Sequence, residues 1–437
     1  MLKNSNAIKY LLFFIDLTLP AALVYALTMA LNTPWQTQYL AIALIAIFLQ
    51  TLAFKLKNLY SPITEQNLFQ TAVHIFYSWI LIFALSTIVT FLIKSTPEVS
   101  RTVIILWCLI TPFTLIVARI ILKKISLKPE THILIIGNQY TFTPYERDRL
   151  QKNKTFLHAL PDTLDTNELI KQINTIQQTQ NIHHIVLNSN QTPAQLIRYY
   201  IQQELKGIRF YTFEHFMEKF LRKCYIPDTH QTLAYLDEIQ PYNNRQKLIK
   251  AVIDYTAASL LILFTIPIML YAAYRIKKES PGTIFFTQKR VGINNKEFTL
   301  IKFRSMHMDA EKHGAQFAQE NDPRAYKFGQ FMRKTRIDEL PQSFNVLKGD
   351  IHFIGPRAER KIFTQKLEME IPYYNERHLI KPGITGWAQV NYPYGANTED
   401  ARQKLMYDLY YIKYWNLALE IETAWKTIAV ILNKKGL

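Results

Sequence analysis

Apolar residues gather in four long stretches within the first 122 residues, at Tyr10–Leu31, Tyr39–Phe54, Ala72–Ile93 and Thr102–Ala118. A helix needs roughly 20 apolar residues to cross a bilayer. The first and third stretches reach this length, and the second does so if it begins near Trp35. A cleaved signal peptide explains the first stretch poorly, because its apolar region is too long and three more stretches follow. The pattern therefore predicts a four-helix transmembrane bundle over residues 1–125.

The charges between these stretches predict how the bundle is oriented. The loops on one side carry many basic residues, namely Lys3, Lys9, Lys55, Lys57, Arg119, Lys123, Lys124 and Lys128. The opposite side has only Lys94 and Arg101, with Glu98 between them. The positive-inside rule therefore places both ends of the bundle in the cytoplasm.

Asp16 is the only acidic residue within a predicted span. A carboxylate inside a membrane is a candidate functional site by default. One isolated carboxylate is more often the partner of a neighbouring helix, and a transporter would need further polar groups in its spans. Asp16 alone therefore does not indicate transport.

After Glu130 the apolar residues fall into short runs separated by helical patterns. Strands are predicted at His132–Gly137, Ile185–Leu187 and Ile208–Tyr211, and helices at Glu168–Thr179 and Pro193–Leu205. Such alternation predicts a small Rossmann-like α/β domain with a parallel sheet over residues 131–240. The turn from Gly137 to Thr141 lacks the second and third glycines of a dinucleotide-binding fingerprint. We therefore favour a structural or regulatory role for this domain over cofactor binding.

A fifth apolar segment, Tyr255–Tyr274, has twenty residues without a charge. Basic residues flank it on both sides, at Arg245, Lys247 and Lys250 and then at Arg275, Lys277 and Lys278. It therefore has no preferred direction of crossing. Pro267 near its centre favours a kink, and Thr265 can help to satisfy the backbone groups that the kink frees. We expect a re-entrant membrane helix over residues 251–275, with a kinked helix that crosses fully as the alternative.

Composition and charge indicate that the chemistry lies at the far end of the chain. Of 437 residues, 49% are apolar and 19% charged, which excludes disorder, and two cysteines exclude a disulfide framework. The net charge is +17, to which residues 275–437 contribute +9 from 27 basic and 18 acidic residues. Ten of the 12 glycines lie at or beyond Gly282, so tight turns and close backbone approaches are concentrated there. The charge indicates an anionic partner: nucleic acid, an acidic membrane or a phosphorylated substrate.

The last third of the chain contains a series of polar motifs. They are Gln288–Gly292 (QKRVG), Phe298–Met306 (FTLIKFRSM), Phe328–Asn345 (FGQFMRKTRIDELPQSFN), Gly349–Glu359 (GDIHFIGPRAE) and Lys381–Asn391 (KPGITGWAQVN). Adjacent Asp338 and Glu339 precede Pro341, which is tolerated in a first helical turn, so both carboxylates are expected at a helix start. Two carboxylates among arginines suit a divalent cation and a diphosphate, and a carboxylate can attack phosphorus. Plain helix capping accounts for the run Asp338–Pro341 equally well.

These motifs resemble the bacterial sugar transferase family, the monotopic phosphoglycosyl transferases that begin exopolysaccharide and O-antigen assembly. The resemblance covers residues 245–437, and the preceding regions are similar to the large members in architecture only. It implies a mostly α-helical monotopic catalytic domain with a re-entrant helix. The implied reaction moves a sugar 1-phosphate from a UDP-sugar to undecaprenyl phosphate and releases UMP, with Mg²⁺ as cofactor. We expect a bacterial inner-membrane protein that contacts phospholipid, has its catalytic domain in the cytoplasm and is compatible with a homodimer.

The family's functional residues can be carried over one by one. The family's Asp-Glu pair falls on Asp338 and Glu339. Asp338 would be the nucleophile, forming a covalent Asp-phosphosugar intermediate, and a Mg²⁺ ligand, while Glu339 would orient the pair or handle a proton. Substrate phosphates would be bound by four cations, Arg333, Arg357, Lys302 and Arg304. Gln288 and Arg290 match a motif after the membrane helix, where a folding role and a ligand role both stay open, and Pro267 is expected to be structural.

The chain departs from the family's pattern at a few positions. Ala358 replaces the second proline of a Pro-Arg-Pro motif, His352 stands where many members carry serine, and Tyr392–Gly395 differs from the commoner run. None of these touches Asp338 or Glu339, so activity is still expected, and the identity of the sugar is what they put in doubt. Two later segments, Tyr407–Leu417 and Ile421–Leu432, are partly amphipathic and suit either the membrane interface or core packing.

Three other classes of function compete with this interpretation. They are a transporter, a nucleic-acid-binding protein and a membrane-anchored regulatory protein of polysaccharide export without catalytic turnover. Phospholipid headgroups account for a membrane-held domain of charge +9 as well as nucleic acid does. We therefore expect no nucleic-acid partner.

Overall fold

The computed structural model describes most of the chain. The described residues are 5–61, 68–92, 99–125, 130–138, 140–161, 163, 165–188, 194–227, 238–310, 322–393, 395 and 397–432. Several residues used above lie outside them, namely Lys3, Lys94, Glu98, Lys128, Gln139, Pro193 and Tyr394. The chain forms two compact units, Met1–Glu130 and Thr131–Leu437.

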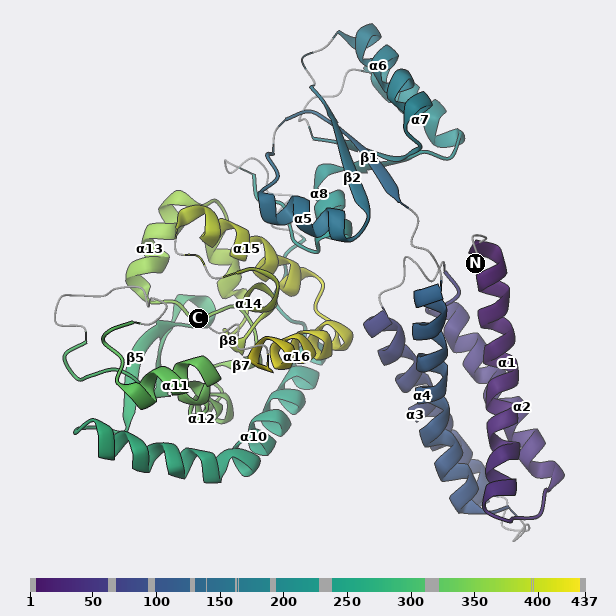
Figure 1. Cartoon of the computed structure of the whole chain (residues 1–437), viewed down its shortest axis with the longest axis horizontal. Coiled ribbons are helices and arrows are strands. Elements are labelled where there is room, and N and C mark those ends of the chain that lie inside the picture. Colours follow the sequence, from purple (N-terminus) through teal and green to yellow (C-terminus); the bar gives the residue numbers. More distant parts are fainter. Residues whose placement is uncertain are drawn as a thin grey trace. The chain divides into compact units, whose positions relative to one another are not determined.

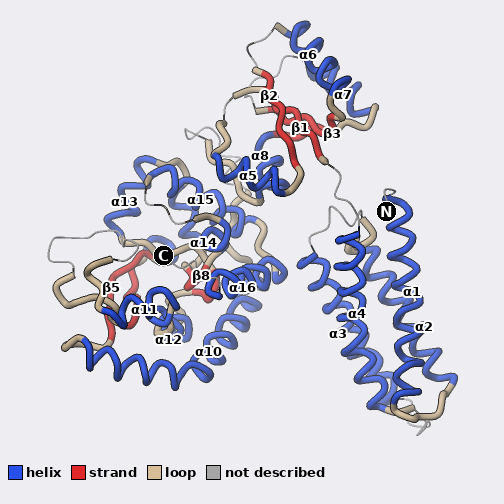
Figure 2. The backbone as a smooth tube through the Cα atoms, in the orientation of Figure 1, coloured by secondary structure: helices blue, strands red, loops and turns tan. Residues whose placement is uncertain are grey.

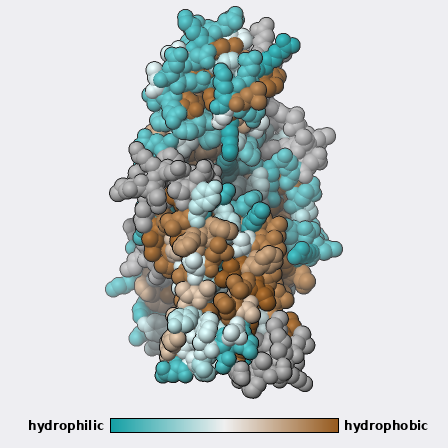
Figure 3. All heavy atoms as spheres, turned by 90° about the vertical axis from the view of Figure 1, so that its right-hand side faces the viewer, coloured by the Kyte–Doolittle hydropathy of each residue, from teal (hydrophilic) through white to brown (hydrophobic). Residues whose placement is uncertain are grey.

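The first unit consists of long apolar helices (Figures 1 and 2). Their bounds are α1, Ser5–Ala30; α2, Thr37–Leu56; α3, Leu68–Leu92; and α4, Arg101–Ile125. α1 packs against α2 and α4, and α3 packs against the same two helices. Each is long and apolar enough to cross a membrane. Figure 3 looks onto these helices and shows a broad band of apolar side chains, as expected of a surface that faces lipid.

A buried polar network joins these helices. Arg119 of α4 donates to both carboxylate oxygens of Asp16 in α1, at 2.9 and 2.7 Å, and both side chains are fully buried. Pro20 of α1 has no N–H, which leaves the carbonyl of Asp16 without its helical donor, and Gln50 of α2 donates to that carbonyl at 2.9 Å. Trp79 of α3 donates to the Gln50 side chain at 3.1 Å. Our prediction that Arg119 is a loop residue was wrong, because α4 continues to Ile125 and buries Arg119 as the partner of Asp16.

The second unit begins with a parallel sheet in the order β2-β1-β3-β4. Its strands are β1, Thr131–Ile136; β2, Thr155–Leu160; β3, Ile182–Leu187; and β4, Arg209–Thr212. Its helices are α5, Pro144–Lys152; α6, Thr166–Thr179; α7, Ala194–Leu205; and α8, Phe213–Phe216, which a π-helical turn extends to Leu221. Leu134 and Ile136 of β1 pack with α6 and α7 on one face, while Ile133 and Ile135 pack with α5 and α8 on the other. Burial on both faces explains why β1 is apolar throughout.

Our sequence prediction missed α5 and β2. α5 (PYERDRLQK) has almost no apolar residues from which a helical period could be recognised. Its start is set instead by Thr143, whose hydroxyl accepts from the backbone N–H of Glu146, while the Glu146 carboxylate accepts from the Thr143 N–H. This reciprocal capping box stabilises the first turn without an apolar face.

α10, Asn244–Glu279, is a 36-residue helix that bends strongly along its length (Figures 1 and 2). Pro267 lies inside it, and the Thr265 hydroxyl donates to the carbonyl of Leu261 at 2.6 Å. Large apolar side chains such as Leu263 and Phe264 are exposed along it. A proline removes one helical hydrogen bond and clashes with the preceding turn, which favours such a bend.

The remaining elements follow α10 in the chain. The strands form two small sheets, antiparallel β5 (Phe285–Val291) with β6 (Glu297–Phe303), and parallel β7 (His352–Ile354) with β8 (Gly383–Thr385). The helices are α11, Lys327–Thr335; α12, Gln342–Lys348; α13, Lys361–Glu370; α14, Trp387–Asn391; α15, Thr398–Lys413; and α16, Leu417–Leu432. Short 3-10 turns lie at Ile293–Asn295, Ile337–Glu339 and Tyr374–Leu379. Gly355 and Gly383 pack backbone to backbone, and a Cβ on Gly383 would lie 2.1 Å from the Gly355 nitrogen, so no larger residue fits there.

One apolar core runs through the second unit. Ile135 and Phe213 from the α/β region belong to the same buried cluster as Trp387 and Tyr407 from the C-terminal region. Residues Tyr407–Leu417, left open between membrane and core, are mostly buried in this cluster. α16 differs, since Ile421, Trp425 and Ile428 are exposed on one of its faces.

Candidate active site

Asp338 and Glu339 lie on a short turn between two helices. α11 ends at Thr335, the next residue Arg336 adopts a left-handed conformation with φ 58°, and the 3-10 turn Ile337–Glu339 follows directly. Pro341 then occupies the N-cap position of α12, as expected for a pair at a helix start. The left-handed residue reverses the chain, so the two carboxylates are presented on a tight turn rather than on a helix face.

The turn is fixed against strand β6. Buried Asn345 of α12 accepts from the Ile301 N–H at 3.0 Å and donates to the Thr299 carbonyl at 2.8 Å. These bonds hold α12 beside β6, and Lys302 of β6 then reaches Glu339 with Nζ 3.1 Å from Oε1. Arg336 approaches the same oxygen at 3.4 Å. Glu339 is therefore paired with two cations.

The two carboxylates differ in their electrostatics. Burial raises the pKa of Asp338 to about 6, and the adjacent Glu339 carboxylate acts in the same direction. Burial also opposes ionisation of Glu339, but Lys302 and Arg336 outweigh it and lower the pKa of Glu339 to about 2. Near neutral pH both are therefore ionised, with Asp338 the more basic of the two.

One carboxylate oxygen of Asp338 lacks a hydrogen-bond donor among the residues that the structure describes. The carboxyl is buried, and Oδ1 accepts no hydrogen bond from the described residues. A buried ionised oxygen with no donor is costly unless a ligand or cation satisfies it. The described residues contain no group of three or more His, Cys, Asp or Glu side chains that could hold a metal by themselves. Mg²⁺ fits such a site, because it is commonly bound by one or two carboxylates together with substrate phosphates.

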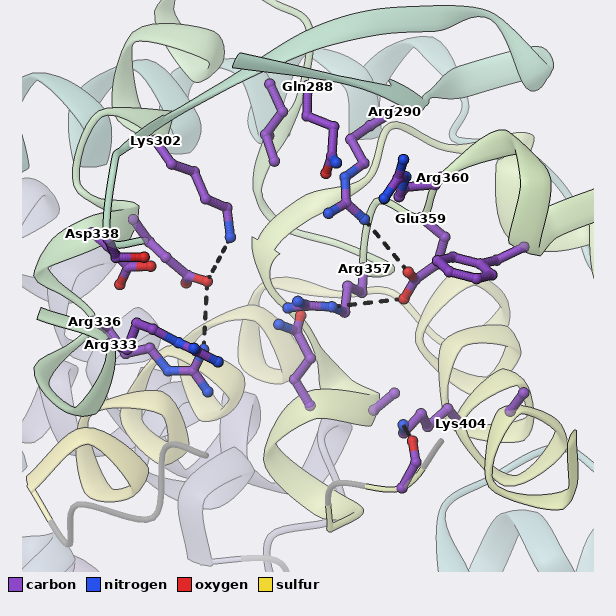
Figure 4. A pocket seen from close by; sticks show the side chains of 18 of the residues that line it. Gln288, Arg290, Lys302, Arg333, Arg336, Asp338, Arg357, Glu359, Arg360 and Lys404 are labelled. Atoms are coloured by element: carbon purple, nitrogen blue, oxygen red, sulfur yellow. Dashed lines mark hydrogen bonds and ion pairs between the residues drawn. The ribbon is translucent and has the colours of Figure 1, made fainter. Parts of the chain in front are cut away.

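A cavity of about 1240 Å³ opens in front of this pair (Figure 4). Its lining is rich in basic side chains, namely Arg290, Lys302, Arg304, Arg324, Arg333, Arg336, Arg357, Arg360, Lys366, Arg377, Lys404 and Lys426. The acidic side chains in the lining are Asp338, Glu339, Glu359 and Asp408. Such an excess of cations around a buried carboxylate suits a ligand with several negative charges, such as a diphosphate.

Comparison with known proteins places this region in a family. The family model described as bacterial sugar transferase matches residues 245–434, which include every lining residue named above. The UDP-glucose:undecaprenyl-phosphate glucose-1-phosphate transferase of Caulobacter vibrioides is 37% identical over 185 residues, 42% of this chain and 69% of that protein. The chain belongs to the bacterial sugar transferase family.

Two further relatives give the range of activities among similar proteins. The UDP-N-acetylgalactosamine-undecaprenyl-phosphate N-acetylgalactosaminephosphotransferase of Aeromonas hydrophila is 44% identical over 237 residues, 50% of this chain and 56% of that protein. The UDP-glucose:undecaprenyl-phosphate glucose-1-phosphate transferase of Xanthomonas campestris is 41% identical over 190 residues, 43% of this chain and 39% of that protein. The chain thus spans only about two fifths to just over half of the length of these two sugar transferases.

A second family model, described as a CoA-binding domain, matches residues 55–135. This range contains α3, α4 and the first five residues of β1. It ends before β2, β3 and β4, so most of the parallel sheet lies outside the match.

The structure brings most of the predicted sugar transferase residues to one cavity. Gln288, Arg290, Lys302, Arg333 and Arg357 all line it together with the Asp-Glu pair (Figure 4). Pro267 is elsewhere, inside α10.

Three arginines of the cavity lie near carboxylates other than those of Asp338 and Glu339. Arg333 lies 3.8 Å from Asp322, and Arg290 and Arg357 lie 3.7 and 3.6 Å from the Glu359 carboxylate. At these distances Glu359 orients both guanidinium groups toward the cavity rather than neutralising either one closely.

Arg304 also lines the cavity, and its guanidinium makes several hydrogen bonds within the protein. Its guanidinium donates to the carbonyls of Thr283, Pro281 and Ser280 and to the Ser280 hydroxyl, at 2.7 Å for Thr283 and 2.9 Å for the hydroxyl. Arg304 is also buried. Four of its five donors are therefore used to hold the turn that follows α10.

Sequence reasoning missed several residues of the site. Arg360 lies two residues after the Pro-Arg-Ala motif, while Lys404 and Lys426 come from α15 and α16. Arg377 is buried, donates to Asp408 at 2.8 Å and also to the carbonyl of Arg357 at 3.2 Å. Nothing near Lys404 and Lys426 in the sequence marks them, because only the packing of α15 against α14 and of α16 against β7 brings them to the cavity.

Proposed function

We propose that the protein transfers a sugar 1-phosphate from a UDP-sugar to undecaprenyl phosphate, releasing UMP. The observation that carries this proposal is the unpartnered, buried oxygen of Asp338 in a cavity lined by cations. Family membership and the activities named for the three relatives above point to the same chemistry. The relatives are named for different sugars, glucose and N-acetylgalactosamine.

Asp338 acts as the nucleophile in a two-step transfer. In the first step a carboxylate oxygen of Asp338 forms a bond to the phosphorus that bears the sugar, and the bond from that phosphorus to UMP breaks. UMP leaves with the electron pair of that bond. In the second step an oxygen of the lipid phosphate attacks the same phosphorus and displaces Asp338, which regains its carboxylate.

The surrounding residues stabilise charge during both steps. Lys302 and Arg336 keep Glu339 ionised, and Glu339 in turn keeps Asp338 basic enough to attack. Arg333 and Arg357 reach the cavity from opposite sides and can bind phosphate oxygens through planar, two-donor contacts. When bound, Mg²⁺ would neutralise phosphate charge, and Asp338 is the residue that would hold it.

We also propose that α10 enters the inner membrane and returns to the cytoplasmic face. Its bend, its exposed apolar surface and the basic residues at both ends support this arrangement. Single cysteines at exposed Gln240 and Pro281 should then both react with an impermeant reagent only from the cytoplasmic side. Native Cys108 and Cys224 are buried and should stay silent. Labelling of the two positions from opposite faces would reject re-entry.

A direct test of the reaction uses the purified full-length protein in nanodiscs. It would be supplied with undecaprenyl phosphate, Mg²⁺ and a panel of UDP-sugars, and UMP release would be measured for each. Release with at least one sugar, abolished by EDTA, is expected. No release with any UDP-sugar, with the protein folded and the lipid present, would contradict the proposal.

A further inference from the structure

One wall of the catalytic cavity comes from the α/β region. Tyr145 of α5 lines the same cavity as Asp338, although the two residues belong to different parts of the chain. The Tyr145 hydroxyl donates to the Asn391 carbonyl at 2.7 Å, and its ring packs edge-on against Tyr392 with centroids 5.7 Å apart. Asn391 and Tyr392 line the cavity as well. Tyr145 keeps 38% of its surface exposed, so part of the ring is free to meet a ligand.

α5 is held firmly in this position. Glu146, the residue after Tyr145, is buried and pairs with buried Lys223, which also donates to Gln403 of α15. One turn later, Arg149 donates to the Tyr407 hydroxyl of α15 at 2.8 Å. Buried pairs that satisfy one another fix relative orientation, because removing either partner is costly. The wall that Tyr145 forms is therefore a built part of the cavity.

The geometry of phosphoryl transfer indicates which part of the substrate reaches the wall that Tyr145 forms. In phosphoryl transfer the attacking and leaving oxygens lie roughly in line. The departing UMP therefore lies on the side of the phosphorus opposite Asp338. Figure 4 shows Asp338 and Lys404 on opposite sides of the cavity, with Arg357 between them.

The side opposite Asp338 is also the side where Tyr145 lies. Lys404 donates to the carbonyl of Gly395 at 2.6 Å, and Tyr392 donates to Asp400 one turn before Lys404 on α15. Tyr392 is the residue against which Tyr145 packs. Tyr145, Tyr392 and Lys404 therefore share the end of the cavity toward which the nucleotide points.

We propose that Tyr145 forms the surface on which the nucleoside of the UDP-sugar packs, so that the α/β region completes the nucleotide subsite. This inference rests on the proposed function for the identity of the ligand. An exposed aromatic ring beside a cation and backbone carbonyls suits a planar base, since base–aromatic stacking does not depend on a specific hydrogen-bond pattern. The α/β region then takes part in substrate binding, which gives a reason for its fixed attachment to α15.

The test compares UMP binding and steady-state kinetics in the full-length protein. Tyr145→Ala removes the ring, and we expect the Kd for UMP and the KM for the UDP-sugar to rise about 10-fold, as loss of one stacking contact does. The KM for undecaprenyl phosphate should not change. Tyr145→Phe keeps the ring and should retain most of the affinity. Tyr199→Ala is the matched control, because Tyr199 is a tyrosine of α7 in the same region that bonds to Asn174 and does not line the cavity.

The outcomes separate this inference from the proposed function. If UMP binds and Tyr145→Ala weakens it while no UDP-sugar is turned over, the nucleotide subsite stands and the transferase proposal fails. If Tyr145→Ala leaves both UMP affinity and the KM for the UDP-sugar unchanged, the inference is overturned. If UMP affinity is unchanged but the preference among UDP-sugars changes, Tyr145 contacts the sugar and the nucleoside assignment is wrong.

Discussion

Two buried aspartates of this chain sit beside arginines with opposite consequences. Asp16 receives two hydrogen bonds from Arg119 on its carboxylate and one from Gln50 on its carbonyl. Asp338 has arginines and a lysine around it, yet its Oδ1 accepts no hydrogen bond from the described residues. A charge that is fully satisfied stabilises a structure, and one that is held among cations but left without a donor is available for a ligand. The comparison therefore distinguishes Asp16, whose carboxylate belongs to a structural ion pair, from Asp338, whose carboxylate is available to react.

The largest expected effect is that of Asp338→Asn. The change keeps the size of the side chain but removes the nucleophile, so turnover should fall by on the order of 10⁴ or more. Because burial disfavours the charge of Asp338, removing that charge should leave the thermal stability of the variant no lower than that of the parent protein. UMP release and thermal unfolding in detergent check the two parts. Full activity of the variant would assign the chemistry to another group.

Asp16→Asn, unlike Asp338→Asn, should lower the stability of the protein. It leaves Arg119 buried with half of its partner gone, which costs about 3–5 kcal/mol of stability. Thermal unfolding of the purified protein measures this loss. The double variant Asp16→Asn with Arg119→Gln should recover part of it, since no charge then remains buried. A single variant as stable as the parent would show that the pair is not needed to hold α1 against α4.

Lys302→Met tests whether a specific cation of the site sets the pKa values of Asp338 and Glu339. Lys302 lowers the pKa of Glu339 and of Asp338, so its loss should raise both and reduce kcat/KM by roughly 10² near neutral pH. The matched control is Lys289→Met on the neighbouring strand β5, because Lys289 is exposed and does not line the cavity. Equal effects of the two variants would count against a specific role for Lys302.

A smaller effect is expected in the pH dependence of the parent. Asp338 must be ionised to attack, and burial raises its pKa to about 6, so the rate should rise with pH through about 6 and level off above it. The effect on stability has the opposite sign, because a raised carboxyl pKa contributes stability at low pH that is lost as the pH rises toward 6. Initial rates of UMP release between pH 4.5 and 8, with saturating substrates, test this. A rate that is flat from pH 4.5 upward would contradict an Asp338 nucleophile with a raised pKa.

The sequence was informative where local pattern decides the structure. Four apolar stretches predicted helices, and short apolar runs predicted the strands β1, β3 and β4. The resemblance to the bacterial sugar transferase family implied that Asp338 and Lys302 share a site, and the cavity contains both. The first two features depend on local periodicity, and the third depends on motifs that could be compared with a known family.

The sequence failed where long-range packing decides. A count of loop charges could not reveal that Arg119 is buried against a residue more than a hundred positions earlier. The Lys-Phe-Arg strand could not show that Lys302 faces Glu339 while Arg304 binds the turn at Ser280. Tyr145 carries no sequence signal at all, since only the docking of α5 on α15 brings it to the cavity.

The central claim is tested most directly by trapping the enzyme with a UDP-sugar in the absence of lipid acceptor. With Asp338 as nucleophile, UMP should be released in an amount that matches the enzyme, and mass spectrometry should find a sugar-phosphate on the peptide that contains Asp338. The Asp338→Asn variant should show neither. If no adduct forms and UMP release requires undecaprenyl phosphate strictly, transfer is direct and Asp338 is a metal ligand rather than the nucleophile.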